Sequence, residues 1–371
     1  MAHFRLLLLL LLPGLLPAQS SSLPRLAAAV DALNRDPDMK GASWGITVLD
    51  ARSGAEVFSF DPHRTLATAS TMKIVSTSTA LAVLGSAYRF PTVLGYTGSL
   101  NDGILQGDLY IRGSGDPSLG SDRFDPAYGP DQLLESWSAR IQAAGIREIR
   151  GRIVGDDGYF SSQITPGEWP WEDMGNYYGA GASSLNYREN LYRLDLEPGP
   201  RAGAGTQVLR TDPALPEITF VNELVTGAPG SGDQAYIYGA PYTGLRYLRG
   251  SIPAGPRVFS IKGSIPDPAY LLALELQEEL TACGVKITAN ATTSRRLRQA
   301  GAPVSDRLQT VHTHLSPPLS ELVRETNMES LNLYAEALAR ASAVARGEAG
   351  ESAAAAKAMQ DYWQSQGVDT D

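Results

Sequence analysis

Ser70 and Lys73 are the two residues whose types and spacing most directly suggest chemistry in this sequence. They form a Ser-x-x-Lys pattern at the start of an apolar segment, residues 74–84, whose spacing is helical. Residues three apart lie on one face of a helix, so the hydroxyl and the amine would be neighbours. A serine hydroxyl is a weak nucleophile until an adjacent base takes its proton. The pair therefore predicts a serine nucleophile with a lysine base, at a helix start whose free N–H groups favour a developing alkoxide.

The segments before Ser70 predict the elements that lead the chain to it. Apolar residues at helical spacing predict a helix over 22–36. Two strand-like runs, 43–49 and 55–60, flank a turn that contains Gly54 and predict an antiparallel hairpin. Ser70 would then follow the hairpin and open the next helix.

The composition changes after Tyr88 and becomes rich in turn signals and β-like segments until about residue 290. The expected strands cover 92–97, 104–113 and 148–156, and the expected helices cover 131–144 and 268–283. We expect a β-rich domain inserted at 89–304, with a subdomain at 191–251. Cys283 has apolar neighbours and is expected to be a packed core thiol.

The last part of the chain returns to helices. A strand at 309–314 is followed by predicted helices at 317–324, 331–344 and 353–364. Together with the hairpin and the β-rich segment, this order indicates an α+β protein.

The first residues resemble a secretory signal peptide. A short basic start precedes the leucine run 6–12, and Ala18 offers a small residue for cleavage. The run is shorter than the roughly 20 residues that cross a membrane. We expect a cleaved signal peptide at 1–18, a periplasmic or secreted protein and no transmembrane segment. The net charge of -9 argues against nucleic acid as a partner.

Ser-x-x-Lys enzymes that recognise penicillin combine this pattern with a Ser-x-Asn box and a Lys-Thr/Ser-Gly box. Ser-Leu-Asn occurs at 99–101, 184–186 and 330–332. The first copy precedes an Asp-Gly turn, and the second lies in a loop of small residues. The third copy lies where one predicted helix hands over to the next, so both polar side chains can face a cleft. Ser330 and Asn332 are therefore the best candidates for the second side of the site.

Other catalytic patterns are weaker. The Gly-x-Ser-x-Gly box at 41–45 begins a predicted strand, whereas a hydrolase nucleophile lies between a strand and a helix. His63, His312 and His314 have no triad context, and no Cys or carboxylate cluster adjoins the histidine pair. We expect no metal and no cofactor.

The mature chain as a whole resembles the class C penicillin-binding proteins, the D-Ala-D-Ala carboxypeptidases/endopeptidases of the bacterial periplasm. Several landmarks carry this resemblance in the order typical of the family. They are Ala69–Lys73, Gly107–Pro117, Gly155–Asp157, Trp169–Asp173, Tyr178–Asn190, His314–Leu319 and Asn327–Asn332.

The resemblance implies a transpeptidase-like domain formed by 22–88 and 305–371, with the β-rich domain inserted between its first two boxes. It implies that Ser70 attacks the carbonyl between two D-alanines and that Lys73 is the base. Ser330 would relay a proton to the leaving D-Ala, and Asn332 would orient the substrate amide. Peptidoglycan stem peptides ending in D-Ala-D-Ala would be the substrates, and β-lactam antibiotics would acylate the same serine.

One departure from the family pattern concerns the third box. No Lys-Thr-Gly or Lys-Ser-Gly occurs, and Lys262-Gly263-Ser264 has the wrong order and lies within the insertion. We expect a C-terminally truncated form of a longer enzyme, which would lack strands of the central sheet and have little or no peptidase activity. The alternatives are a β-lactamase-like or esterase-like acyl hydrolase and a non-catalytic cell-wall binding protein.

Overall fold

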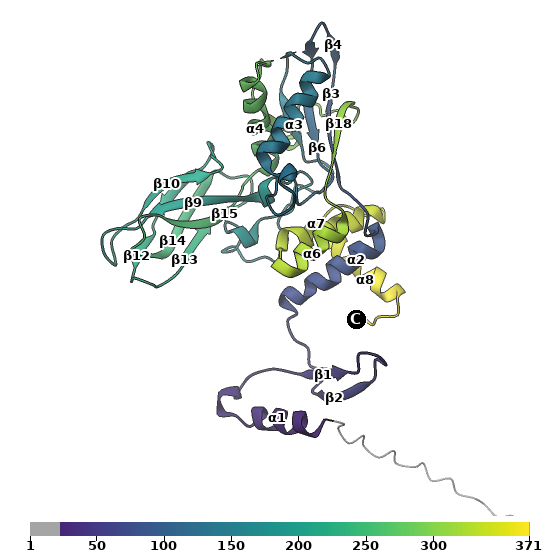
Figure 1. The fold of residues 1–371 in the computed structure, drawn as a ribbon, viewed down its shortest axis with the longest axis vertical. Coiled ribbons are helices and arrows are strands. Elements are labelled where there is room, and N and C mark those ends of the chain that lie inside the picture. Colours follow the sequence, from purple (N-terminus) through teal and green to yellow (C-terminus); the bar gives the residue numbers. More distant parts are fainter. Residues whose placement is uncertain (1–22, 371) are drawn as a thin grey trace, which may run out of the picture. The chain divides into compact units, whose positions relative to one another are not determined.

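The computed structural model describes residues 23–370, so the expected signal peptide at 1–18 lies outside the described residues. The chain divides into two compact units, one ending at Ala69 and the other beginning at Ser70 (Figure 1). All the candidate catalytic residues belong to the second unit.

The first unit contains the predicted helix and hairpin. Its elements are α1 (Pro24–Asn34), the 3-10 turn η1 (Pro37–Met39), β1 (Ile46–Leu49) and β2 (Glu56–Phe60). β1 and β2 pair antiparallel, which confirms the predicted hairpin. The Asp50 carboxylate closes the turn because it accepts hydrogen bonds from the Ser53 hydroxyl and from the Ser53 and Arg52 backbone N–H groups, and these bonds lower the pKa of the carboxyl.

Four helices of the second unit pack together. They are α2 (Met72–Leu84), α6 (Leu319–Glu329), α7 (Asn332–Ala345) and α8 (Ser352–Ser365). Ala80 of α2 packs with Leu322 of α6 and Leu338 of α7 in one buried cluster. The Trp363 indole N–H of α8 donates to Thr79 Oγ1 of α2 at 2.9 Å. Segments more than 200 residues apart in the sequence therefore form one helical layer.

Two sheets follow α2 in the chain. A five-stranded sheet has the order β17-β8-β6-β3-β18, and a four-stranded sheet has the order β16-β7-β5-β4. Their strands are β3 (Pro91–Tyr96), β4 (Ser99–Asn101), β5 (Ile104–Gln106), β6 (Leu109–Arg112), β7 (Glu148–Ile149), β8 (Ile153–Asp156), β16 (Lys286–Ile287), β17 (Thr292–Thr293) and β18 (Gln309–Leu315). The accompanying helices are η3 (Pro126–Tyr128), α3 (Pro130–Ala143), α4 (Pro268–Ala282) and α5 (Ser294–Gln299).

The predicted strands 104–113 and 148–156 are each broken into two, so these two predictions were too long. β5 and β7 pair in one sheet, while β6 and β8 pair in the other. Both breaks fall at glycines that touch. A Cβ on Gly151 would lie 2.2 Å from the Gly107 carbonyl oxygen, so only glycine allows this approach. The chain crosses from the four-stranded to the five-stranded sheet between β5 and β6 and again between β7 and β8. Both crossings occur where these two backbones are in contact.

A second group of strands projects from the same unit in Figure 1. β9, β10 and β15 form a three-stranded sheet, and β14 pairs with β11, β12 and β13. The elements here are η4 (Tyr177–Gly179), η5 (Arg188–Asn190), β9 (Leu191–Glu197), β10 (Gln207–Asp212), β11 (Thr219–Asn222), β12 (Val225–Gly227), β13 (Gln234–Tyr238), β14 (Leu245–Pro253) and β15 (Phe259–Ser264). The helices and sheets together confirm the α+β class, while the domain boundaries at 88 and 305 stay a prediction. Cys283 is exposed, so its predicted place in the core was wrong.

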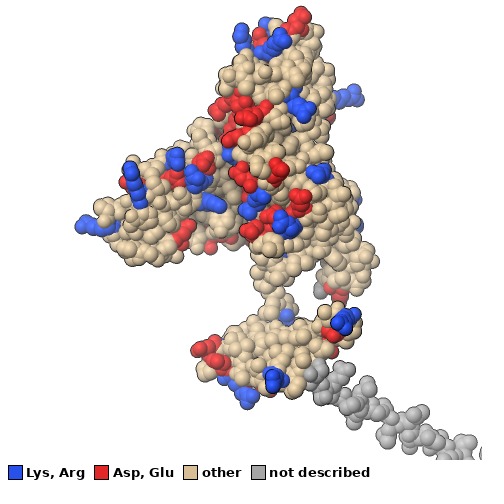
Figure 2. Space-filling model, viewed as in Figure 1, with Lys and Arg blue, Asp and Glu red and all other residues tan. Residues whose placement is uncertain are grey.

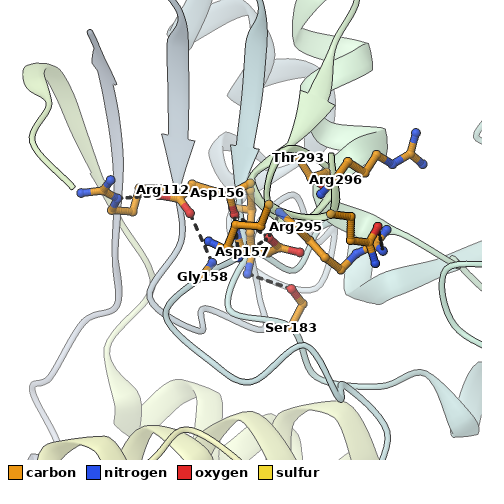
Figure 3. A network of polar contacts seen from close by, with 12 residues as sticks. Arg112, Asp156, Asp157, Gly158, Ser183, Thr293, Arg295 and Arg296 are labelled. Atoms are coloured by element: carbon orange, nitrogen blue, oxygen red, sulfur yellow. Dashed lines mark hydrogen bonds and ion pairs between the residues drawn. The ribbon is translucent and has the colours of Figure 1, made fainter. Parts of the chain in front are cut away.

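The Gly155–Asp157 landmark is a structural clamp (Figure 3). Arg112 of β6 forms an ion pair with Asp156 of β8 at 2.7 Å and donates to the Ser305 carbonyl. Asp157 accepts from the Ser294 hydroxyl at 2.7 Å, at the start of α5. Burial raises the pKa of Asp157. These contacts hold the five-stranded sheet against Ser294 and Ser305, in the segment that leads from α5 to β18 and then to α6.

Asp116, in the Gly107–Pro117 landmark, provides a pH prediction. Burial raises the pKa of its carboxyl to about 6, and one of its oxygens has no partner. Because the folded pKa of Asp116 lies above the usual 3.8, the contribution of this carboxyl to stability falls as the pH rises from about 4 to 6. Above pH 6 that contribution stays constant. The cost above pH 6 is at most about 3 kcal/mol at ~1.4 kcal/mol per unit. Asp116→Asn should therefore gain stability at pH 7 but not at pH 3.5, as measured by urea unfolding.

The matched control is Asp122→Asn, since Asp122 is exposed in the same loop. Its urea midpoint is expected to follow the wild-type pH dependence. An Asp116→Asn protein with that same pH dependence would show that the buried carboxyl does not titrate in this range.

Candidate active site

Ser70 and Lys73 lie side by side at the beginning of α2. Ser70 sits in a 3-10 turn, η2 (Ala69–Thr71), that leads directly into the helix. Lys73 Nζ and Ser70 Oγ form a hydrogen bond at 3.1 Å. Partial burial lowers the pKa of Lys73 from its usual value. The neutral amine, the form that can accept a proton, is thus more accessible here than in a solvated lysine.

Ser330 reaches the same hydroxyl from another helix. It caps α6 in the left-handed region, with φ 57° and ψ 46°. α7 begins two residues later at Asn332. Ser330 Oγ and Ser70 Oγ form a hydrogen bond at 2.9 Å. Since few non-glycine residues adopt this conformation without support, the sharp helix-to-helix connection holds Ser330 in place.

A polar contact between the two helices fixes this approach. Thr77 of α2 and Asn327 of α6 form a side-chain hydrogen bond at 3.3 Å. Each lies within two turns of the residue that it positions, Ser70 or Ser330. The sequence analysis assigned neither residue a role. The only signal available was that Asn327 opens the last landmark of the family pattern.

The side chain of Asn332 bonds to a different part of the chain from Ser330. Its side-chain amide donates to the Tyr178 carbonyl at 2.8 Å, in η4. This bond joins α7 to the segment that carries the second Ser-Leu-Asn. A cavity of about 260 Å³ adjoins Asn332. It is lined by Arg123, Tyr177, Tyr178, Glu189, Leu191, Lys262, Glu329, Ser330, Leu331, Asn332, Leu333 and Tyr334.

The two other Ser-Leu-Asn copies are structural. Ser99–Asn101 is a strand of the β4–β5 hairpin. Asn186 is fully buried and donates to the Asp116 carbonyl at 3.1 Å. A Cβ on Gly113 would lie 2.0 Å from the Ser184 carbonyl oxygen, so the two landmarks pack backbone to backbone. The structure brings together Ser70, Lys73 and Ser330, and it places Asn332 beside them on the next helix.

The D-Ala-D-Ala carboxypeptidase 3 (S13) family model matches residues 26–371, so the chain belongs to this family. It is 28% identical over 366 residues to a D-alanyl-D-alanine carboxypeptidase of Actinomadura sp., a match that covers 96% of this chain and 64% of that protein. It is 22% identical to the carboxypeptidase DacB of Haemophilus influenzae, covering 82% of this chain and 60% of that protein. The chain thus spans less than two thirds of the length of these relatives.

The fold matches a solved structure of penicillin binding protein 4 (dacB) from Haemophilus influenzae. The TM-score is 0.71 at 21% identity, over 88% of this chain and 68% of that one. A structure of the same protein complexed with a β-lactam matches with a TM-score of 0.66 at 19% identity, over 89% of this chain and 67% of that one. The family and the class of fold expected from the landmarks are confirmed. Among residues 23–370, no helix is both long and apolar enough to cross a membrane.

Proposed function

We propose that this protein is a serine-type D-Ala-D-Ala carboxypeptidase/endopeptidase that acts on peptidoglycan stem peptides. The observation that carries the proposal is the pair of hydrogen bonds on Ser70 Oγ, to Lys73 Nζ at 3.1 Å and to Ser330 Oγ at 2.9 Å. A nucleophile, a base one turn away and a hydroxyl from a second helix are the parts needed for acyl transfer.

The reaction follows from this arrangement. Neutral Lys73 takes the Ser70 proton while Ser70 Oγ bonds to the carbonyl carbon between two D-alanines. Protonated Lys73 returns this proton through the Ser330 hydroxyl to the amide nitrogen as the C–N bond breaks and D-Ala leaves. Water then cleaves the ester on Ser70 and restores the hydroxyl. The same steps open a cross-link when the leaving amine belongs to a second stem peptide.

The proposed substrate also implies that the protein acts outside the cytoplasm. We propose export by the signal peptide at 1–18, because peptidoglycan lies beyond the inner membrane. β-Lactams would acylate Ser70, since their strained amide offers the same electrophilic carbonyl.

Labelled penicillin tests the proposal. We expect a covalent adduct that mass spectrometry assigns to the peptide containing Ser70, and release of D-Ala from a pentapeptide measures how much peptidase activity accompanies it. Rapid release of hydrolysed penicillin without D-Ala release would favour a β-lactamase-like enzyme. A folded protein that forms no adduct but still binds peptidoglycan would favour a non-catalytic cell-wall binding protein.

Ser330→Ala should slow acylation by penicillin about tenfold, because it removes one hydrogen bond of about 1.4 kcal/mol from Ser70. The measurement is the rate of adduct formation under single-turnover conditions. Ser320→Ala on the same helix is the control and should react at the wild-type rate. An unchanged rate in Ser330→Ala would remove Ser330 from the proposed mechanism.

A further inference from the structure

Lys262 belongs to the Lys-Gly-Ser triplet that the sequence analysis set aside, yet it lines the cavity that Ser330 and Asn332 also line. It lies on β15, in the β-rich part of the chain. A cation from this part therefore lines the same cavity as two of the four proposed catalytic residues, Ser330 and Asn332.

A rigid series of contacts joins Lys262 to Asn332. Gly263 forms a β-bridge with Asn176, and the Ser264 N–H donates to the Gly175 carbonyl at 2.9 Å. Asn176 leads directly into η4, whose Tyr178 carbonyl accepts the Asn332 amide. A Cβ on Gly263 would lie 2.3 Å from the Tyr192 ring, so only glycine packs this closely after Lys262.

The two arginines around Lys262 are already paired. Arg193, opposite Lys262 on β9, forms ion pairs with Asp195 and Asp212, both at 3.1 Å. Arg123, the other cation of the cavity, pairs with Glu189 at 2.7 Å.

Glu189 in turn accepts from Ser121 and Tyr334 with the same oxygen that Arg123 contacts. Within residues 23–370, Lys262 forms no ion pair and is exposed, so its ammonium is free to meet a ligand. Charged side chains of both signs are interspersed over the face shown in Figure 2.

We propose that Lys262 is a specificity residue that binds a carboxylate of the stem peptide outside the scissile D-Ala-D-Ala unit. The inference rests on the proposed function, because that function supplies a peptide substrate bound beside Ser330. Glu329 lines the same cavity and also forms no ion pair in the described part of the chain. It opposes this carboxylate, so the two side chains act in opposite directions on one ligand.

The test measures binding by calorimetry in a Ser70→Ala background, where no peptide is cleaved. Two pentapeptides ending in D-Ala-D-Ala serve as probes, one with a free side-chain carboxylate and one with that group amidated. Lys262→Met should bind the carboxylate peptide about fivefold more weakly and the amidated peptide with unchanged affinity. Glu329→Gln should bind the carboxylate peptide more tightly.

Lys286→Met is the matched control, since Lys286 is an exposed strand lysine of the same β-rich part that does not line this cavity. It should bind both peptides with unchanged affinity. An equal loss for both peptides in Lys262→Met, no loss at all, or no binding of the carboxylate peptide by the parent protein would each overturn the inference. Penicillin labelling of Ser70 is measured separately, so a failure of the proposed function is recognised independently.

Discussion

Replacing Ser70 by alanine is expected to abolish the covalent penicillin adduct. The substitution removes the one oxygen on which the Lys73 and Ser330 hydrogen bonds converge. Without a nucleophile no acyl-enzyme can form, so we expect the acylation rate to fall by at least about 10⁴-fold. Gel detection of a fluorescent penicillin, supported by intact-protein mass spectrometry, measures this loss.

The control is Ser78→Ala, because Ser78 lies on the same helix two turns beyond Ser70 and is not one of the proposed catalytic residues. This variant should be labelled as fast as the wild type. Circular dichroism must show that both variants remain folded. A persistent adduct in Ser70→Ala would move the nucleophile to another residue and refute the proposed mechanism.

Local patterns in the sequence could identify the nucleophile but not its second partner. Ser-Leu-Asn occurs in three places with the same letters, so the copies differ in their surroundings and not in the triplet itself. Ser184 is buried in a backbone contact, whereas Ser330 is exposed in a left-handed cap. The position of the third copy between two predicted helices favoured Ser330, and the family resemblance then settled the choice.

Secondary structure was predictable where periodicity was long and uninterrupted. The helices at 131–144 and 268–283 match α3 and α4 to within one residue. The strands that were predicted too long failed because a contact between two glycines far apart in the sequence decides where they break.

Buried charge was also hidden from the sequence. Arg340 lies in an alanine-rich helix that reads as an ordinary amphipathic one, yet its side chain is fully buried. It pairs with Glu336 at 2.8 Å and donates to Ser352 at 2.8 Å. Arg340 also donates to the Ile164 carbonyl, so its partners come from three different stretches of the chain. Since an unpaired buried cation is costly, only the assembled fold explains why arginine is tolerated there.

Lys73→Met is the second substitution with a large expected effect. Removing the base should slow acylation of Ser70 by about 10² to 10⁴-fold, the usual contribution of a positioned general base. Lys73→Arg keeps the positive charge but cannot release its proton at any pH used. We therefore expect the arginine variant to be as slow as the methionine variant, which separates proton transfer from electrostatic attraction.

The pH dependence gives a further check on the same lysine. Burial lowers the pKa of Lys73 below its usual 10.5, so the wild-type acylation rate should rise with pH and reach half its maximum below that value. The Lys73→Met and Lys73→Arg variants should both lack this rise of the acylation rate with pH. A wild-type acylation rate that reaches half its maximum only at or above pH 10.5 would argue against Lys73 as the base. A Lys73→Arg variant that is acylated at the wild-type rate would argue against it too.

Lys73→Met should raise the stability of the folded protein while it lowers the acylation rate. Because the folded pKa of Lys73 is lowered, the unfolded chain holds more protons between that value and 10.5. The burial cost of the ammonium is therefore present at neutral pH and is relieved as the pH rises from the folded pKa to 10.5. Lys73→Met should thus unfold at a slightly higher temperature than the wild type at pH 7, with this gain shrinking towards pH 10. A structural lysine would lose stability and activity together, so a more stable but inactive variant identifies the catalytic role.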